Sequence, residues 1–314
     1  MRIGFLFPGQ GSQSLGMGKA LFEEYEAARN VFSEAERVLG WDVAALCFEG
    51  PEARLNQTEF TQPALLTASI AAWRVLGSPI VAGTLVAGHS LGEFTALVAA
   101  GALSFADAVR IVHLRGRFMQ EAVPEGKGAM AAIIGLNRGD VEALCAAASS
   151  DAGVVSPANY NGPSQIVISG ESDAVARAMA LATKKGAKRA IRLAVSVPSH
   201  SPLMRPACLR LSTELDQIGG RDLQKPLVNN LAAKAIETWT AAKAGLVDQL
   251  SSPLLWEETM ALMQKRGVDQ FIEVGPGRIL SGLLKRIDRR AKVMCVENPE
   301  SVEQGLALIN QSAS

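Results

Sequence analysis

The stretch Thr84–Ala100, TLVAGHSLGEFTALVAA, decides the fold. A short apolar run leads into Gly-x-Ser-x-Gly at residues 88–92, and a second apolar segment follows. This order predicts a strand, a tight turn that carries Ser90, and a helix. Glycine permits the sharp bend, and we expect the helix to start at Ser90 so that its free N–H groups face any negative charge formed there. Such a serine is suited to attack a carbonyl, and the pattern alone leaves that carbonyl unspecified.

Short apolar strands bounded by glycine alternate with helices on both sides of this turn, which is typical of a parallel α/β sheet. The expected strands are 3–7, 85–87, 227–230 and 271–274. The expected helices are 17–39, 62–76, 93–100, 105–120, 203–215, 241–250, 256–266 and 279–287. We therefore expect a large α/β-hydrolase-like domain built from residues 1–127 and 198–314.

The segment 128–197 has a different order of expected elements: strand, helix, strand, strand, helix, strand. This is the order of a ferredoxin-like subdomain. Its expected elements are 129–134, 138–148, 154–157, 165–169, 173–185 and 189–195. Glycine and proline mark its entry near 124–128 and its exit at Val197-Pro198. Because it is inserted within the larger domain, we expect it to cover a cleft.

Composition excludes several classes of function. The 314 residues are 48% hydrophobic, which is ample for a large core, and 31 basic residues balance 31 acidic ones. No overall field attracts nucleic acid or an anionic membrane. The apolar stretch 64–87 is interrupted by Arg74 and by Gly77-Ser78-Pro79, so a helix followed by a buried strand is favoured over a membrane span.

The cysteines and histidines point away from a metal centre. The four cysteines are far apart, and with three histidines in the chain no ligand cluster is expected. Isolated thiols suit a reducing cytoplasm. The chain enters a strand directly after Met1-Arg2, and no signal peptide fits there, so we expect a soluble cytoplasmic protein.

A serine nucleophile needs a base, and the chain offers three histidines. His89 adjoins Ser90, but neighbouring side chains on a turn diverge. His113 falls in the middle of an expected helix, where a surface or packing role is favoured. His200 lies in the loop Val197–Pro202, where catalytic residues concentrate, and it is the best partner for the serine.

An oxyanion hole is the next requirement. The N–H of Leu91, directly after the serine, is the first expected donor. The glycine-rich loop 7–13 follows the first strand, at the end of the sheet where α/β proteins hold ligands. A phosphate-binding loop is the alternative, but neither G-x-G-x-x-G nor a following lysine motif is present. The N–H of Gln10 is therefore the expected second donor.

Arg115 is expected on the same apolar helix face as Val112 and Met119. An arginine there either extends its charged end to water or holds an anion. A planar guanidinium binds a carboxylate through two hydrogen bonds. The spacing alone leaves both readings open.

Six motifs occur together along nearly the whole chain. They are FPGQGSQ (7–13), GHSLGEFTALVAAG (88–101), RGRFMQEAVPEG (115–126), SPANYNGPSQIVISG (156–170), SVPSHSPLM (196–204) and VGPG (274–277). In this order they resemble the bacterial malonyl-CoA:acyl carrier protein transacylases of fatty-acid synthesis. Gly-x-Ser-x-Gly alone would be a weak signal, whereas the set is specific.

The resemblance implies a role for each matching residue. Ser90 would be the acylated nucleophile and His200 its base, with the amides of Gln10 and Leu91 as oxyanion donors. Arg115 would pair with the malonyl carboxylate. The main-chain carbonyl of Gln249, in LVDQLSSP, would orient the histidine. The remaining expected pocket residues are His89, Met119, Asn159, Asn161 and Val197.

The resemblance also implies the substrates and partners. Malonyl-CoA would acylate the serine, and the phosphopantetheine thiol of an acidic acyl carrier protein would accept the malonyl group, with no permanent cofactor or metal and with a monomeric enzyme. A local basic rim is implied, with Lys188, Arg189, Lys285 and Arg286 as candidates beside the alternative of ordinary solvated charge.

Two rival functions come from other classes. A serine esterase or thioesterase shares the turn, but such enzymes usually carry an acid and then a histidine late in the chain, whereas more than a hundred residues follow His200. A non-catalytic scaffold or loading module is the second rival, and the presence of every catalytic position argues against it.

Overall fold

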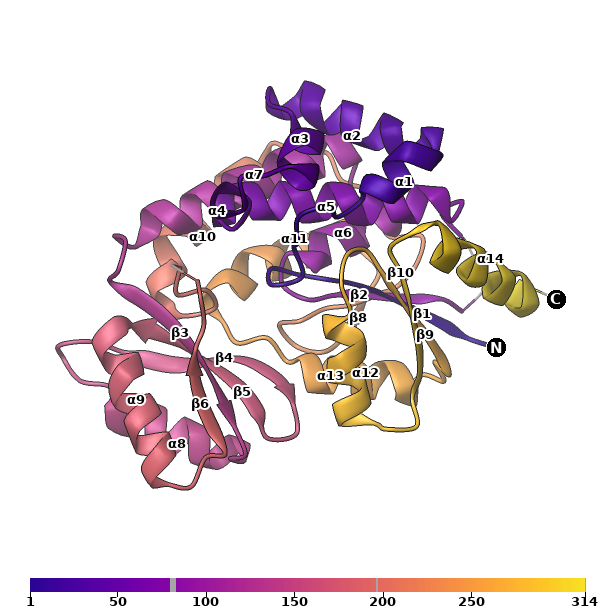
Figure 1. Ribbon diagram of the computed structural model, residues 1–314. Coiled ribbons are helices and arrows are strands. Elements are labelled where there is room, and N and C mark those ends of the chain that lie inside the picture. The colour runs from indigo at the N-terminus through magenta and orange to yellow at the C-terminus, as the bar shows by residue number, and fades with distance from the viewer. Residues whose placement is uncertain (80–82, 196, 314) are drawn as a thin grey trace.

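The computed structural model describes residues 1–79, 83–195 and 197–313; Ser196, in the motif at 196–204, lies outside the described residues. A six-stranded sheet carries the serine turn near its middle (Figure 1). Its order is β10 (Lys292–Val296), β9 (Gln270–Val274), β1 (Ile3–Phe7), β2 (Leu85–Gly88), β7 (Leu227–Val228) and β8 (Ala235–Ile236). The first five strands are parallel and β8 is antiparallel to β7, so the expected parallel sheet is a mixed one.

The register of β1 and β2 positions the site. Phe7 lies opposite Gly88, so both strands end at the same edge of the sheet. The glycine-rich loop after β1 therefore runs beside the serine turn after β2. This is the edge where ligands bind in open α/β sheets.

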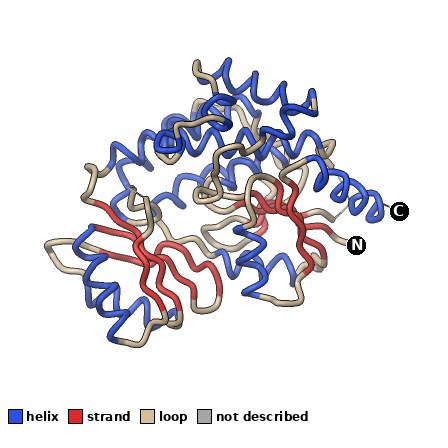
Figure 2. The backbone as a smooth tube through the Cα atoms, in the orientation of Figure 1, coloured by secondary structure: helices blue, strands red, loops and turns tan. Residues whose placement is uncertain are grey.

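Helices cover both faces of this sheet (Figures 1 and 2). The N-terminal half contributes α1 (Lys19–Glu24), α2 (Glu26–Leu39), α3 (Val43–Phe48), α4 (Glu52–Leu55), α5 (Thr58–Val75), α6 (Gly92–Ala99) and α7 (Phe105–Ala122). The C-terminal part contributes η1 (Pro202–Met204), α10 (Arg205–Asp216), α11 (Trp239–Asp248), η2 (Gln249–Ser251), α12 (Trp256–Lys265), α13 (Ile279–Ile287) and α14 (Pro299–Ala313).

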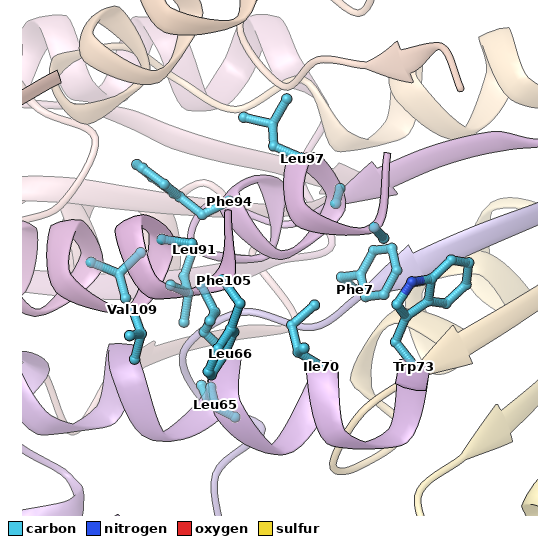
Figure 3. Packing of buried hydrophobic residues seen from close by; sticks show 14 of the residues in the cluster. Phe7, Leu65, Leu66, Ile70, Trp73, Leu91, Phe94, Leu97, Phe105 and Val109 are labelled. Carbon is cyan, nitrogen blue, oxygen red and sulfur yellow. The ribbon is translucent and has the colours of Figure 1, made fainter. Parts of the chain in front are cut away.

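The core of this layer surrounds α5, which is buried along nearly its whole length. Phe5 and Phe7 from β1 meet the ring of Trp73 edge-on, with centroids 4.9 and 5.7 Å apart. Figure 3 shows Leu91 and Phe94, from the serine turn and α6, packed in the same cluster. Close packing here fixes the turn rigidly against the sheet.

Two of the differences between the expected and the observed helices follow from the backbone conformation of a single residue. The predicted helix 17–39 is two helices, because Tyr25 between them has extended backbone (φ −112°, ψ 127°). The predicted start of a helix at Ser90 is wrong: Ser90 has φ +52°, a left-handed conformation that cannot continue a helix, and α6 begins at Gly92. Ser104 caps α7 as expected, accepting from the Asp107 N–H at 3.0 Å.

A second, antiparallel sheet has the order β4 (Val155–Gly162), β5 (Gln165–Glu171), β3 (Gly128–Ile134) and β6 (Arg189–Arg192). One face packs under α8 (Arg138–Ala148) and α9 (Ser172–Lys184). Alternation along the strands turns Met130 and Val167 to the other face, away from these helices. That face is directed at the serine turn.

Strand bounds shift where tertiary pairing decides them. β4 runs well past the expected 154–157 and so includes Asn159 and Asn161, because its pairing with β5 continues to Gly162, opposite Gln165. The Tyr160 N–H also donates to the Leu254 carbonyl at 2.8 Å. β6 ends at Arg192, short of the expected 195. Sequence reasoning missed α3, α4, β8, β10 and α14 altogether.

Candidate active site

A pocket opens between the two sheets, above the serine turn. Its lining includes ten of the eleven residues expected at the site: Gln10, His89, Ser90, Leu91, Arg115, Met119, Asn159, Asn161, Val197 and His200. The eleventh, Gln249, lies behind His200 and is fully buried. Over the described ranges, no group of acidic, cysteine and histidine side chains could hold a metal ion, and no helix is long and apolar enough to cross a membrane.

Close backbone contacts shape the turn around Ser90. A Cβ on Gly92 would lie 2.1 Å from the Phe7 carbonyl oxygen, and one on Gly88 would lie 1.9 Å from that of Gly92. Only glycine fits at either place. The strained backbone of Ser90 is held by its N–H, which donates to Asn230 Oδ1 at 2.8 Å.

His200 is hydrogen-bonded on both ring nitrogens. Nε2 lies 2.9 Å from Ser90 Oγ, and Nδ1 lies 2.7 Å from the Gln249 main-chain oxygen. A carbonyl can only accept, so Nδ1 carries the proton and Nε2 is free to accept one from the serine. Burial lowers the pKa of His200 to about 3, which keeps the imidazole neutral.

Two main-chain N–H groups at the pocket are free. Within the described part of the chain, neither Leu91 nor Gln10 finds a hydrogen-bond acceptor for its N–H. The Gln10 side chain is anchored where Oε1 accepts from Thr58 Oγ at 2.8 Å. The paired loops after β1 and β2 thus bring two unused donors to one pocket, as an oxyanion hole requires.

Arg115 brings a positive charge to the bottom of the pocket. Its side chain is 1% exposed, so the charged end does not reach bulk water, and the reading as an extended surface arginine is wrong. Nη1 donates to Gln62 Oε1 at 2.7 Å, and Nη2 to Ser90 Oγ at 3.2 Å and Gln249 Oε1 at 3.3 Å. Among the residues that the structure describes, no carboxylate pairs with it directly, and its Nε has no partner. Burial lowers its pKa to about 10, so the group stays charged at neutral pH.

The other two histidines take different roles. His89 Nε2 lies 2.9 Å from Asn161 Oδ1, and its ring meets that of Trp256 edge-on, so it joins the two sheets and does not bond to Ser90. His113 is turned to the far side of α7, where Nδ1 lies 3.2 Å from the Glu59 carbonyl oxygen. The packing role expected for it is the one observed.

Nearly the whole chain matches known acyl transferases. A family model described as the acyl transferase domain matches residues 4–298. This chain belongs to the acyl transferase domain family. It is 45% identical over 310 residues to the malonyl CoA-acyl carrier protein transacylase of Bacillus subtilis, covering 99% of this chain and 98% of that one. It is 46% identical over 308 residues to the enzyme of that name from Escherichia coli K12, covering 98% and 99%.

Solved structures of acyl transferases superpose closely. The malonyl CoA-acyl carrier protein transacylase of Coxiella burnetii has a TM-score of 0.96 at 43% identity over 98% of both chains. A malonyl-transacylase in complex with its type II PKS acyl-carrier protein has a TM-score of 0.95 at 46% identity, over 98% of this chain and all of that one. The α/β fold with a mixed sheet and a second antiparallel sheet is thus the fold of these enzymes.

Sequence reasoning missed three buried polar residues of this acyl transferase: Gln62, Glu93 and Asn230. All three are at most 1% exposed, and each bonds to a residue of the expected site. Glu93 left a signal in the sequence, because it is a lone acid in the apolar segment GEFTALVAA. Burial raises its pKa to about 7. A carboxylate held away from water in this way needs partners, and they come from distant segments.

Proposed function

We propose that this acyl transferase moves a malonyl group from malonyl-CoA to the phosphopantetheine thiol of an acyl carrier protein, through a malonyl ester on Ser90. The observation that carries the proposal is the buried guanidinium of Arg115, which lies 3.2 Å from Ser90 Oγ and has no acidic partner within the described residues. The relatives named malonyl CoA-acyl carrier protein transacylase, matched over nearly their full length, support the same substrate and acceptor.

In the first half-reaction, His200 Nε2 removes the proton from Ser90 Oγ as that oxygen attacks the thioester carbonyl. The amides of Leu91 and Gln10 stabilise the negative oxygen of the tetrahedral intermediate. Losing one such donor typically costs about 10²–10³ in rate. As the C–S bond breaks, His200 returns its proton to the departing CoA thiol.

In the second half-reaction, the carrier thiol gives its proton to His200 and attacks the malonyl ester. The Ser90 oxygen leaves and recovers the proton. Throughout, the carboxylate of the acyl group would take the place of Ser90 Oγ as a partner of Arg115 Nη2, while Gln249 Oε1 keeps its own bond to that nitrogen. An acetyl group offers no such partner, which leaves the buried guanidinium unpaired and makes acetyl a poor substrate.

The orientation of His200 supports transfer over the rival esterase function. Its Nδ1 faces the neutral carbonyl of Gln249, where the esterases compared above carry an acid. We further propose that residues 1–127 and 198–314 form one α/β-hydrolase-like domain, and that 128–197 form a ferredoxin-like subdomain. The 4-1-3-2 arrangement of its sheet, β6-β3-β5-β4, supports that description. A monomeric cytoplasmic enzyme fits these proposals.

Intact mass after exposure to malonyl-, methylmalonyl- and acetyl-CoA tests the proposal. We expect one malonyl adduct on the wild-type chain and none on Ser90→Ala, while Ser169→Ala, which removes another buried hydroxyl, is acylated normally. Arg115→Ala removes a charge-assisted contact worth about 1.5–3 kcal/mol, so malonylation should slow by about 10- to 100-fold while acetylation is spared.

The control for Arg115 is another arginine on the same helix. Arg110 pairs with Glu214 at 2.9 Å, on the outside of α7, and Arg110→Ala should leave both acylation rates unchanged. An equal loss of malonyl and acetyl transfer in Arg115→Ala would contradict a carboxylate-binding role. A malonyl adduct on Ser90→Ala would overturn the nucleophile assignment.

A further inference from the structure

Glu93 is a buried carboxylate that the reaction described above does not use. It lies in the first turn of α6 and is 1% exposed. An acid in a first turn commonly stabilises its own helix, by accepting from the free N–H groups there. The Glu93 carboxylate makes no such bond in the described structure, and its hydrogen-bond donors come from two other segments. The cost of burying it is therefore met by partners outside α6.

One oxygen of this carboxylate holds two residues at once. Oε2 accepts from Gln249 Nε2 at 3.0 Å and from the Asn230 main-chain N–H at 3.0 Å. Gln249 belongs to η2, and Asn230 follows β7, so a single atom ties two separate segments to α6.

Each of these partners holds part of the reacting machinery. The Gln249 main-chain oxygen accepts from His200 Nδ1, and its side-chain Oε1 accepts from Arg115 Nη2. Asn230 Oδ1 accepts from the Ser90 N–H, while its Nδ2 donates to the Gly88 carbonyl at 2.8 Å. Nucleophile, base and guanidinium are each one residue removed from Glu93 Oε2.

The arrangement also balances charge without closing the pocket. The Gln249 amide lies between the Arg115 guanidinium and the Glu93 carboxylate, accepting from one and donating to the other. A direct ion pair would occupy the guanidinium nitrogens that face Ser90. With the amide between them, the negative charge offsets that of Arg115 while Nη2 stays available to a substrate carboxylate.

We propose that Glu93 is a positioning residue: through Gln249 and Asn230 it aligns Ser90, His200 and Arg115 for acyl transfer. This inference rests on the proposed function. It assigns Glu93 no contact with substrate. What it requires is an acceptor oxygen at the position of Oε2, at the full length of a glutamate side chain.

Three substitutions at Glu93 separate the effect of its acceptor oxygen from the effect of its negative charge. Glu93→Ala removes the acceptor, Glu93→Asp keeps the charge but withdraws it by one methylene, and Glu93→Gln keeps an acceptor of the right length without charge. The measurement is the rate constant for malonylation of the folded protein at saturating malonyl-CoA, by rapid quench and intact mass, beside the same rate with acetyl-CoA and the melting temperature.

Glu93→Ala and Glu93→Asp should lower the malonylation rate constant by about 10- to 100-fold, because small displacements of reacting groups cost that much. Acetylation should fall less, since it uses Ser90 and His200 but not Arg115. Glu93→Gln should recover the malonylation rate to near that of the wild type, because it keeps an acceptor oxygen of the right length and so keeps the geometry of the reacting groups. If Glu93→Ala does not fold, the contrast between Asp and Gln decides the question.

Thr95→Val is the matched control. Thr95 lies on the same helix, is 1% exposed, and has a hydroxyl without a partner in the described residues, so its rate should equal that of the wild type. Variants of Glu93 with lowered melting temperature but wild-type rate constants when folded would show a purely structural role and overturn the inference. Failure of the proposed function would look different, because the wild-type chain itself would then form no malonyl adduct.

Discussion

At the scale of single residues, the surroundings of His200 predict an unusual pH profile. Burial is the main cause that lowers its pKa from 6.5 to about 3, and the nearby charges of Arg115 and His89 act in the same direction. The imidazole accepts the Ser90 proton only when it is neutral, which holds at every pH above its own pKa. As pH falls from 8 to 5, His200 should therefore stay neutral, and kcat/KM for malonylation should not show the loss expected of a solvated histidine.

The measurement is kcat/KM for malonyl-CoA between pH 5 and 8, which reports groups in the free enzyme. Glu93, whose pKa burial raises to about 7, titrates inside this range. The Glu93→Gln variant is therefore run in parallel, and any step present in the wild type but missing in the variant belongs to Glu93. A loss of activity centred near 6.5 in both proteins would mean that His200 is solvated and would contradict the prediction.

At the scale of elements, the close contact between the serine turn and the end of β1 should be highly sensitive to substitution. A Cβ at Gly92 would lie 2.1 Å from the Phe7 carbonyl oxygen, so Gly92→Ala must push α6 away from β1. The two N–H groups proposed as oxyanion donors belong to these two loops, and the distance between them would change. We expect a lower melting temperature together with an acylation rate reduced by about 10²-fold or more, the cost of losing one donor.

Gly139→Ala is the control for this substitution. Gly139 also lies in the first turn of a helix, α8, and a Cβ there would meet its nearest neighbour at 3.6 Å, which is ordinary contact. Alanine should stabilise that helix slightly, by about 0.4–1 kcal/mol, with no change in acylation. Wild-type acylation in Gly92→Ala would show that the two loops need not be in close contact.

The same scale shows what the sequence could predict. The strand at 3–7 and the helices at 138–148 and 279–287 were expected with their exact bounds. In each, a glycine or a capping residue marks the end of a regular pattern of apolar residues. The motifs placed ten expected residues around one pocket. Glu93 and Asn230 were not predicted as site residues. Their hydrogen bonds join segments more than 130 residues apart, and no local sequence pattern indicates such contacts. The left-handed backbone of Ser90 was missed for a related reason: it is imposed by tertiary contacts.

At the scale of the whole molecule, a basic hollow on the surface lies beside the pocket between the two sheets. The hollow is lined by Arg189, the first residue of β6, with Lys188 just before it, and by Arg286 in the last turn of α13, with Arg289 just after that helix. Gln165 lines both the hollow and the active-site pocket, and Arg286 donates to its side chain. Cations from both layers thus gather at a hollow next to the active-site pocket, although the net charge of the chain is zero.

The lining of this hollow changes the set of residues expected to form the basic rim that the family resemblance implied. Lys285, one of the four candidates, is exposed on α13 but is not among the described residues that line the hollow, whereas Arg289 is. An acidic carrier protein docking here would deliver its flexible arm past Gln165 toward Ser90. Its association rate would depend on charge, since charges at the rim of an interface act mainly on encounter.

The prediction concerns the double variant Lys188→Glu with Arg189→Glu. Transfer from malonyl-Ser90 to an acidic carrier protein should slow by about 10-fold at low salt, because electrostatic steering is lost. The difference from the wild type should shrink with added salt, as the screening length falls from about 30 Å at 0.01 M to about 3 Å at 1 M.

Two controls separate docking from chemistry. Transfer to free pantetheine, an uncharged thiol, should be unchanged. Lys19→Glu, on α1 and outside the lining of the hollow, is the control for a charge reversal elsewhere on the surface. Equal slowing with the carrier protein and with pantetheine would place the defect in the chemical site, and salt-independent slowing would exclude steering as the role of these cations.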